Sequence, residues 1–309
     1  MSGYRGEDLF LRHIESNSLR KVDAKGFRAH ESLPDFMIQW GQDAMSVYGV
    51  ERIITSTVNA AHRCVIGDNA LCGQFCFAHA EKGGAQDFRQ DIPLAYVLEH
   101  RRLQKLGQEA SIFLSTDIEP LPGNKDAKAQ EVTDITNRVL VKMVDHPPAG
   151  LILHTHTDIS IRDDVLRVLR DVNQSTNLIV GVGFETDTED LPNGLPAPCT
   201  TIERRLRTIE VLANNGIKTQ AAVAPLVGFK DFESFAKRFP AIGAYRIMVG
   251  DLRLDFAIGG TKKAATLKAR LGLPAPTQED AKAYFESLGY APELVAYRDQ
   301  FYVVLPEKK

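Results

Sequence analysis

Three cysteines lie close together in the sequence and supply the residue type that binds soft metal ions and metal clusters. Cys64, Cys72 and Cys76 fall in the segment HRCVIGDNALCGQFCFAH, where seven residues separate the first two cysteines and three separate the last two. Thiolates select iron–sulfur clusters, zinc or copper(I). Three thiolates on a four-iron cluster would leave one iron open to a small molecule, which suits an enzyme better than an electron carrier.

Zinc is the main alternative ligand for these thiols. Zinc sites usually take four Cys or His ligands with repeated short spacings. The segment holds no second short pair, although His62 or His79 could complete a zinc site. Three unligated core cysteines are less expected in a loop rich in Gly, Asp and Asn. The fourth cysteine, Cys199, stands far away, and four cysteines in 309 residues are too few for a disulfide framework.

The composition is that of an ordinary soluble globular protein, with 44% hydrophobic and 25% charged residues. No stretch approaches the ~18 apolar residues of a membrane span, and the N-terminal segment lacks the apolar core of a secretory signal. We therefore expect a cytoplasmic protein without a membrane partner. The net charge of -3 argues against a nucleic-acid partner, which would usually require a basic excess.

Short apolar runs alternate with helical patterns from about residue 52 onward, which predicts repeated β-α units and a parallel sheet. We expect strands at 52–58, 110–114, 150–154, 178–184, 218–223 and 244–249. We expect helices at 94–106, 130–144, 162–172, 201–214 and 232–238. Outside these units, the sequence predicts an apolar helix at 35–48, and two helices and a strand-like run at 300–305 near the C-terminus. Six such units suit an incomplete or complete barrel, although an open doubly wound sheet has the same periodicity.

Polar residues follow the predicted strands. In parallel α/β folds, the chemistry sits at the carboxyl ends of the strands. These ends carry Ser115-Thr116-Asp117, the run from His154 to Asp158, Glu185-Thr186-Asp187, Ala224-Pro225 and Gly250-Asp251. The pattern predicts a polar rim around an active site, although loops in general are also polar.

The segment from Cys72 to Ala78, CGQFCFA, resembles the cluster loop of radical S-adenosylmethionine (SAM) enzymes, particularly the branch related to spore photoproduct lyase. In that branch an aromatic residue precedes the last cysteine. The usual family spacings are three and two residues, whereas this sequence has seven and three. The resemblance extends in order over about residues 52 to 252, through FLSTDIEPLPGN, GLILHTHTDISIRDDVLRVL, VGVGFETDTEDL and APCTTIERRLRTIEVLANNGIKTQAAVAPLVGFKD.

The resemblance implies an α/β fold, a partial (β/α)6 TIM-like barrel over residues 52–255. Residues 1–51 would form an N-terminal extension, and residues 256–309 a C-terminal appendage that could cap the substrate. It also implies two cofactors, a [4Fe-4S] cluster and SAM. An electron donor such as flavodoxin or ferredoxin would reduce the cluster, which cleaves SAM to a 5′-deoxyadenosyl radical that abstracts a hydrogen atom.

By the same resemblance, Cys64, Cys72 and Cys76 are the cluster ligands. Arg205 would pair with the SAM carboxylate, because a guanidinium fork matches two oxygens at once. Its alternative is a solvated helix face beside other arginines. Glu185 would accept hydrogen bonds from the ribose hydroxyls, unless it is an ordinary carboxylate at the end of a strand.

The remaining predicted cofactor contacts come from other strand ends. Phe75 would pack near the adenine, unless it is an ordinary aromatic residue of the core. The SAM amino group or ribose would contact Ser115, Thr116 and Asp117. Cys199 would return a hydrogen atom to the product radical, as a cysteine does in spore photoproduct lyase, unless it is an incidental loop residue.

His154 and His156 also match the start of a hydrolase metal site, as in metallo-β-lactamases or amidohydrolases. Both families need further histidines later in the chain, and all eight histidines here lie at or before His156. We therefore interpret the pair as part of the rim facing SAM or substrate, or as loop histidines.

The leading functional hypothesis is a radical SAM enzyme that acts on a small molecule or a nucleoside. A second hypothesis is a radical SAM lyase that repairs DNA lesions, which the net charge disfavours. A third is a zinc- or iron-binding protein without SAM chemistry. A brown protein with about four irons that releases 5′-deoxyadenosine would separate the first hypothesis from the third.

Overall fold

The computed structural model describes residues 37–40, 53–58, 60–61, 64–66, 70–76, 88, 90–105, 107, 109–114, 118–123, 126–252 and 262–297. Several predicted features lie outside these residues. They are Ser115, Thr116, Asp117, the possible zinc ligands His62 and His79, and the strand-like run at 300–305.

The described strands form one eight-stranded sheet whose spatial order follows the chain order. Its first strand is antiparallel to the second, and every later neighbour pair is parallel. The sheet is not closed within the described residues. The strands are β1 (Met37–Trp40), β2 (Ile53–Val58), β3 (Glu109–Leu114), β4 (Gly150–Thr155), β5 (Asn177–Gly183), β6 (Lys218–Leu226), β7 (Arg246–Asp251) and β8 (Val295–Tyr297).

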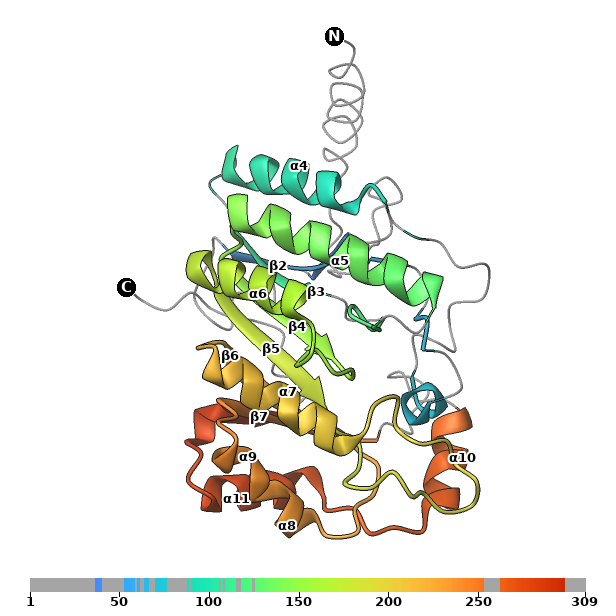
Figure 1. The fold of residues 1–309 in the computed structure, drawn as a ribbon. Helices are drawn as coiled ribbons and strands as arrows, with labels where there is room; N and C mark the ends of the chain where they lie inside the picture. Colours follow the sequence, from blue (N-terminus) through green and yellow to red (C-terminus); the bar gives the residue numbers. More distant parts are fainter. Residues whose placement is uncertain are drawn as a thin grey trace.

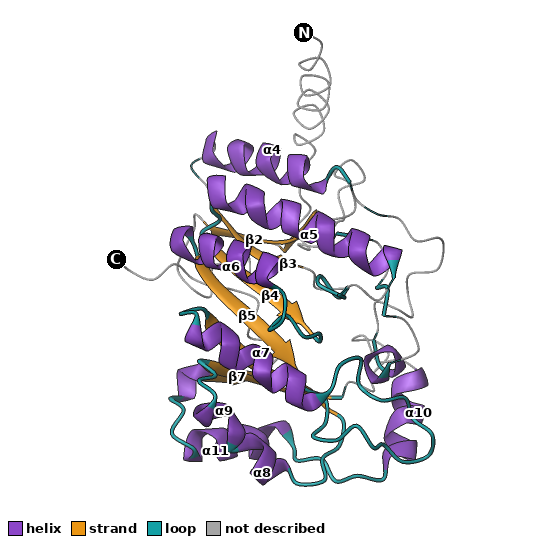
Figure 2. Cartoon of the chain, viewed as in Figure 1, coloured by secondary structure: helices purple, strands orange, loops and turns teal. Residues whose placement is uncertain are grey.

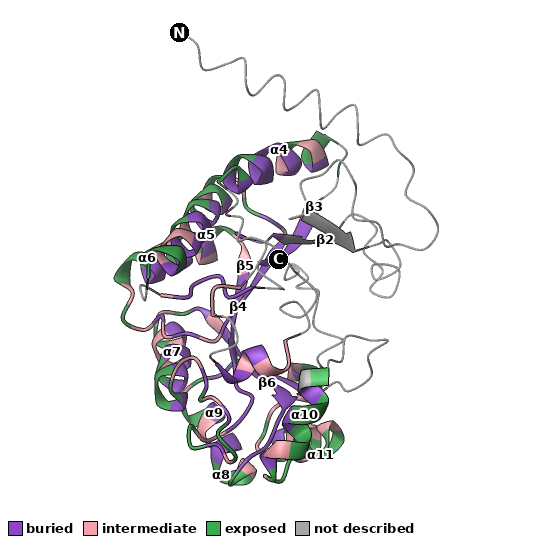
Figure 3. Ribbon diagram, turned by 90° about the vertical axis from the view of Figure 1, so that its right-hand side faces the viewer, coloured by how far each residue is buried: buried purple, intermediate pink, exposed green. Residues whose placement is uncertain are grey.

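Helices connect the parallel strands and lie on one face of the curved sheet. Figures 1 and 2 show α4 to α7 in a row over the strands, and Figure 3 shows them as an arc outside the sheet. The described helices are η2 (Leu71–Gln74), α4 (Ile92–Lys105), α5 (Ala127–Asp145), α6 (Asp163–Ser175), α7 (Ile202–Asn214), α8 (Phe232–Ala236), α9 (Arg238–Ala241), α10 (Lys262–Leu271), α11 (Gln278–Ser287) and η4 (Pro292–Leu294).

Each strand divides its side chains between two faces, because successive residues point to opposite sides of a sheet. On β4, Leu151 and Leu153 are buried in the main core together with apolar residues of α4, α5 and α6. Ile152, between them, packs instead with Phe113 and Ile179 of the neighbouring strands. A different set of side chains therefore lines the face of the sheet that points away from the helices. This set includes every second residue toward the carboxyl end of β4.

A group of aromatic rings joins the last helices to the sheet. Phe239 is fully buried, and its ring centroid lies 5.0 Å from that of Phe235, 5.2 Å from Phe184 and 5.9 Å from Phe285. Tilted and edge-on ring pairs at such distances are favourable beyond the area that they bury. These contacts tie α8, α9 and α11 to the end of β5.

The structure confirms the predicted α/β class, with helices alternating along a parallel sheet that is consistent with a partial barrel. The predicted strands and the first four predicted helices match β2 to β7 and α4 to α7 to within a few residues. The helix expected at 232–238 is instead two short helices, α8 and α9, that meet at Lys237.

The helix expected at 35–48 is wrong at residues 37–40, which form β1. Met37 pairs with Val58 and Trp40 with Thr55 across an antiparallel ladder. The apolar run is compatible with a helix or a strand. Pairing with β2, which comes later in the chain, stabilises the strand.

The predicted domain limits at residues 51 and 255 remain predictions. Strands on either side of that range extend the sheet, since β1 pairs with β2 and β8 pairs with β7. Among the described helices, none has the length and apolar character needed to cross a membrane.

We predict that Phe239→Ala lowers the free energy of unfolding by about 3–5 kcal/mol, because it opens a cavity in the aromatic group. Urea denaturation followed by circular dichroism measures the change. The matched control is Ile161→Ala, since the Ile161 side chain is 75% exposed and should change stability by less than about 0.5 kcal/mol. An equal effect of the two substitutions would contradict this description of the core.

Candidate functional site

The cysteine segment is held against the loop between β5 and α7. Cys72 lies within η2, and the Cys76 N–H donates to the Cys72 carbonyl oxygen at 3.0 Å. The Leu71 N–H donates to the Ala197 carbonyl oxygen, also at 3.0 Å. Leu71 is fully buried with Leu191, Leu195 and residues of α10. Backbone and apolar contacts therefore hold this segment at the carboxyl end of the sheet.

The fold brings the three sequence-predicted ligands near one another. Cys64 lies close enough to Cys76 and to Cys72 for the charges of these thiols to affect one another. Cys199, 127 positions after Cys72 (199 minus 72), joins them, because the Cys72 and Cys199 thiols hydrogen-bond to each other. Within the described residues, however, no three His, Cys, Asp or Glu side chains are arranged to hold a metal ion.

The thiols differ in acidity. Burial raises the pKa of Cys64 to about 11. The hydrogen bond to Cys199, together with burial, raises the pKa of Cys72 well above its usual range. The same hydrogen bond lowers the pKa of Cys199 to about 7; burial opposes this effect and the charge of Arg205 adds to it. Of Cys64, Cys72 and Cys199, Cys199 is therefore the thiol most readily ionised near neutral pH.

A buried ion pair lies beside these thiols. The Arg205 side chain of α7 is fully buried, and its Nη1 donates to Glu185 Oε2 at 2.5 Å and to the Gly183 carbonyl oxygen at 2.7 Å. Its Nη2 lies 3.6 Å from Cys199 Sγ. Burial opposes the charge of each group, but the partner outweighs it, so the pKa of Arg205 is raised and that of Glu185 is lowered. The alternative of a solvated Arg205 is thereby excluded.

The ion pair keeps unused hydrogen-bonding capacity. Glu185 Oε1 and Arg205 Nε are buried and have no hydrogen-bond partner within the described part of the chain. A buried polar atom without a partner costs free energy, so these two atoms are places where a polar ligand would be stabilising. This acceptor and donor, near the Cys72 and Cys199 thiols, suit the polar groups of an organic ligand.

Glu119 organises the end of β4 and was not predicted as a site residue. Its Oε1 accepts from the Thr155 hydroxyl at 2.6 Å, and its Oε2 accepts from the His156 N–H at 2.7 Å. Its own N–H donates to Cys64 Sγ at 3.4 Å. The available signal was a carboxylate two residues after the last predicted rim residue, Asp117, in the otherwise apolar run IEPLPG.

His156 lies at the centre of this group of residues. Its Nδ1 is 3.7 Å from Glu119 Oε2, and its side chain is 31% exposed. Its carbonyl oxygen accepts from the Cys199 thiol at 3.1 Å. Burial lowers the pKa of His156. The Glu119 hydrogen bond and the Glu185 charge together raise it by more than burial lowers it, so the net shift is upward.

His154 lies on β4, two residues before His156. Its Nε2 is 2.6 Å from Gln220 Nε2, and Gln220 Oε1 accepts from Arg246 Nε at 2.6 Å. A Cβ on Gly181 would lie 1.9 Å from the His154 ring, so the absence of a side chain on β5 makes room for this imidazole. The described contacts of His154 are thus with residues of other strands, Gln220 of β6 and Phe113 of β3.

The other predicted contacts are less central. Phe75 packs against the apolar residues of α10 and the β5–α7 loop. Asp187 accepts from the N–H groups of Lys230 and Asp231, each at 2.7 Å, and so fixes the loop after β6.

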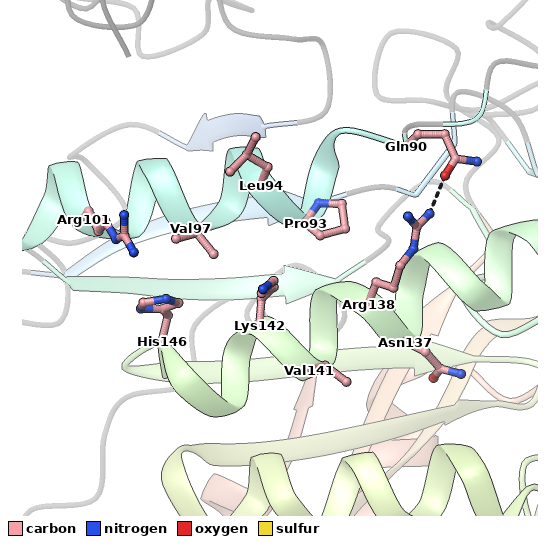
Figure 4. A pocket seen from close by; sticks show the side chains of 10 residues that line it. All are labelled: Gln90, Pro93, Leu94, Val97, Arg101, Asn137, Arg138, Val141, Lys142 and His146. Carbon is pink, nitrogen blue, oxygen red and sulfur yellow. Dashed lines mark hydrogen bonds between the residues drawn. The ribbon is translucent and has the colours of Figure 1, made fainter. Parts of the chain in front are cut away.

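A groove between α4 and α5 does not belong to this site. Figure 4 shows its lining on the outer helices, and its volume is about 520 Å³. Apolar Leu94 and Val141 line it together with basic Arg101 and Lys142. None of the predicted site residues lines this groove.

Comparisons with known proteins leave the family open. No family model matches the chain, and no curated protein matches it. Among solved structures, the crystal structure of Streptococcus suis SuiB is similar with a TM-score of 0.47 and 11% sequence identity. The match covers 95% of this chain but only 60% of that one. A likeness of this size is too weak to carry a conclusion about function.

We predict that Glu119→Gln lowers the pKa of the His156 imidazole, because the variant removes the carboxylate that favours the protonated ring. A pH titration of the imidazole by NMR measures this pKa. The pKa of His156 is raised in the folded protein, so the protonated imidazole stabilises the fold. This stabilisation is fully present below the unfolded pKa of about 6.5 and is lost as the pH rises through the folded pKa. The loss of stability in Glu119→Gln should therefore be larger on the acidic side.

The control for this titration is Glu233→Gln, an exposed carboxylate at the start of α8. It should leave the His156 titration unchanged. An unchanged His156 pKa in Glu119→Gln would show that the carboxylate does not act on the ring.

Proposed function

We propose that this chain is a radical SAM enzyme that binds a [4Fe-4S] cluster through Cys64, Cys72 and Cys76. The observation that carries the proposal is that three thiols of one loop lie near one another, and that Cys72 among them lies near a buried ion pair with an open acceptor and donor. When bound, the cluster supplies the electron that cleaves SAM to a 5′-deoxyadenosyl radical, which abstracts a hydrogen atom from the substrate.

The residues of the chain bind and orient the organic cofactor. Arg205 presents Nε–H to a carboxylate, while Glu185 keeps the guanidinium fixed and offers Oε1 to a hydroxyl or an amino group. His156, held by Glu119, is the partly exposed polar group next to them. Phe75, packed against α10, supplies an apolar surface for a ring.

We propose a small-molecule or nucleoside substrate and an external electron donor of the flavodoxin or ferredoxin type. The net charge of -3 favours such a substrate over a DNA lesion. Cys199 contacts both Cys72 and Arg205, which supports a place for it at the site, where a hydrogen-atom donor would have to lie.

We predict that replacing Cys64, Cys72 or Cys76 singly by Ala removes most bound iron and abolishes SAM cleavage, because three thiolates are the minimum anchor for a cluster with one open iron. Iron and sulfide content after anaerobic reconstitution, and 5′-deoxyadenosine release under a strong reductant, measure the two effects.

Two outcomes would contradict the ligand assignment. A Cys64→Ala variant that kept a full cluster and normal SAM cleavage would show that another group, and not Cys64, is the first cluster ligand. A colourless wild-type protein that bound one zinc and released no 5′-deoxyadenosine would support the zinc protein without SAM chemistry.

We predict that Arg205→Lys weakens SAM binding about tenfold to a hundredfold, as expected from the loss of one charge-assisted hydrogen bond worth roughly 1.5–3 kcal/mol. A lysine keeps the charge but lacks the planar fork. Equilibrium binding of SAM to the reconstituted protein measures the change, while the iron content should stay constant.

The matched control is Arg207→Lys on the same helix, because Arg207 is exposed and pairs only with half-buried Glu210 among the described residues. Its SAM affinity should equal that of the wild type. Unchanged SAM affinity in Arg205→Lys, with altered substrate turnover, would show that Arg205 binds the substrate and not SAM.

A further inference from the structure

Two segments that are distant in the sequence are joined at the site. The Leu71 N–H donates to the Ala197 carbonyl oxygen at 3.0 Å, one residue before Cys72 and two residues before Cys199. Leu71 also packs against Leu191 and Leu195 of the same loop. The backbone bond and the apolar contacts hold the two cysteine-bearing segments side by side.

The side chains of Cys72 and Cys199 are in contact with each other. The Cys72 and Cys199 side chains hydrogen-bond to each other, so the sulfur atoms are neighbours. Cys199 Sγ also lies 3.1 Å from the His156 carbonyl oxygen and 3.6 Å from Arg205 Nη2. Both cysteines are partly accessible rather than fully buried.

We propose that Cys72 and Cys199 form a redox modification site, at which a low-molecular-weight disulfide oxidises the cluster-free protein to a Cys72–Cys199 disulfide. The consequence for iron rests on the proposed function. Because Cys72 is a proposed cluster ligand, the disulfide and the cluster exclude each other. The site therefore protects the ligand from further oxidation and couples cluster assembly to thiol reduction.

The reaction balances with a disulfide such as oxidised glutathione. The Cys199 thiolate attacks one glutathione sulfur, forms a mixed disulfide and releases one glutathione thiolate. The Cys72 thiolate then attacks the Cys199 sulfur and releases the second glutathione. Two protein thiols lose two electrons and two protons, and the glutathione disulfide gains them to give two glutathione thiols. Dithiothreitol reduces the protein disulfide back to the two thiols.

The test uses the full wild-type chain, freed of iron by a chelator and exposed to oxidised glutathione. The expected product has lost two hydrogens in its intact mass and contains a cross-link between the peptide with Cys72 and the peptide with Cys199. Glutathione bound stably to either cysteine, or a disulfide only among Cys64, Cys72 and Cys76, would overturn the proposal.

Single substitutions identify the partner within the cysteine loop. The cross-link to Cys199 should persist in Cys64→Ser and Cys76→Ser and disappear in Cys72→Ser. Persistence in Cys72→Ser would overturn the assignment. Because this test needs no cluster, it can succeed or fail independently of SAM cleavage.

Iron uptake measures the consequence of the disulfide. Oxidised wild-type protein should take up little iron until dithiothreitol is added, whereas Cys199→Ala should take up iron equally before and after the reductant. Equal uptake by oxidised and reduced wild-type protein, with the disulfide shown by mass, would overturn the exclusion between disulfide and cluster.

Discussion

The ion pair between Arg205 and Glu185 is the interaction on which the arrangement of this site depends. A charge buried without its partner is strongly destabilising, so the guanidinium of α7 must meet the carboxylate at the end of β5. Arg205 also contacts the Gly183 carbonyl oxygen and Cys199. One side chain thus fixes the strand end, the helix and the loop that reaches the cysteine segment.

The parallel sheet supplies the remaining order. The carboxyl ends of neighbouring strands lie at the same edge, so groups that follow β3, β4 and β5 meet there. Glycines on β5 allow this convergence: a Cβ at Gly181 or Gly183 would lie 1.9 Å or 2.3 Å from the ring of His154 or His156. The missing side chains of one strand accommodate the imidazoles of its neighbour.

Local sequence patterns were sufficient for the units of the fold, because buried parallel strands are apolar runs and their helices are periodic. They also located the cysteine segment. They could not predict β1, whose conformation depends on pairing with β2. Nor could they assign Glu119 or the contact of Cys72 with Cys199, because these depend on long-range packing that leaves no local spacing.

We propose that the thiols of the cysteine loop hold a cluster with one iron open to SAM. The most direct measurement is electron paramagnetic resonance of the reconstituted, reduced wild-type protein before and after SAM is added. We expect the signal of a reduced [4Fe-4S] cluster whose g values shift when SAM binds the open iron. A reduced cluster whose signal stays unchanged at saturating SAM would contradict the proposed open iron.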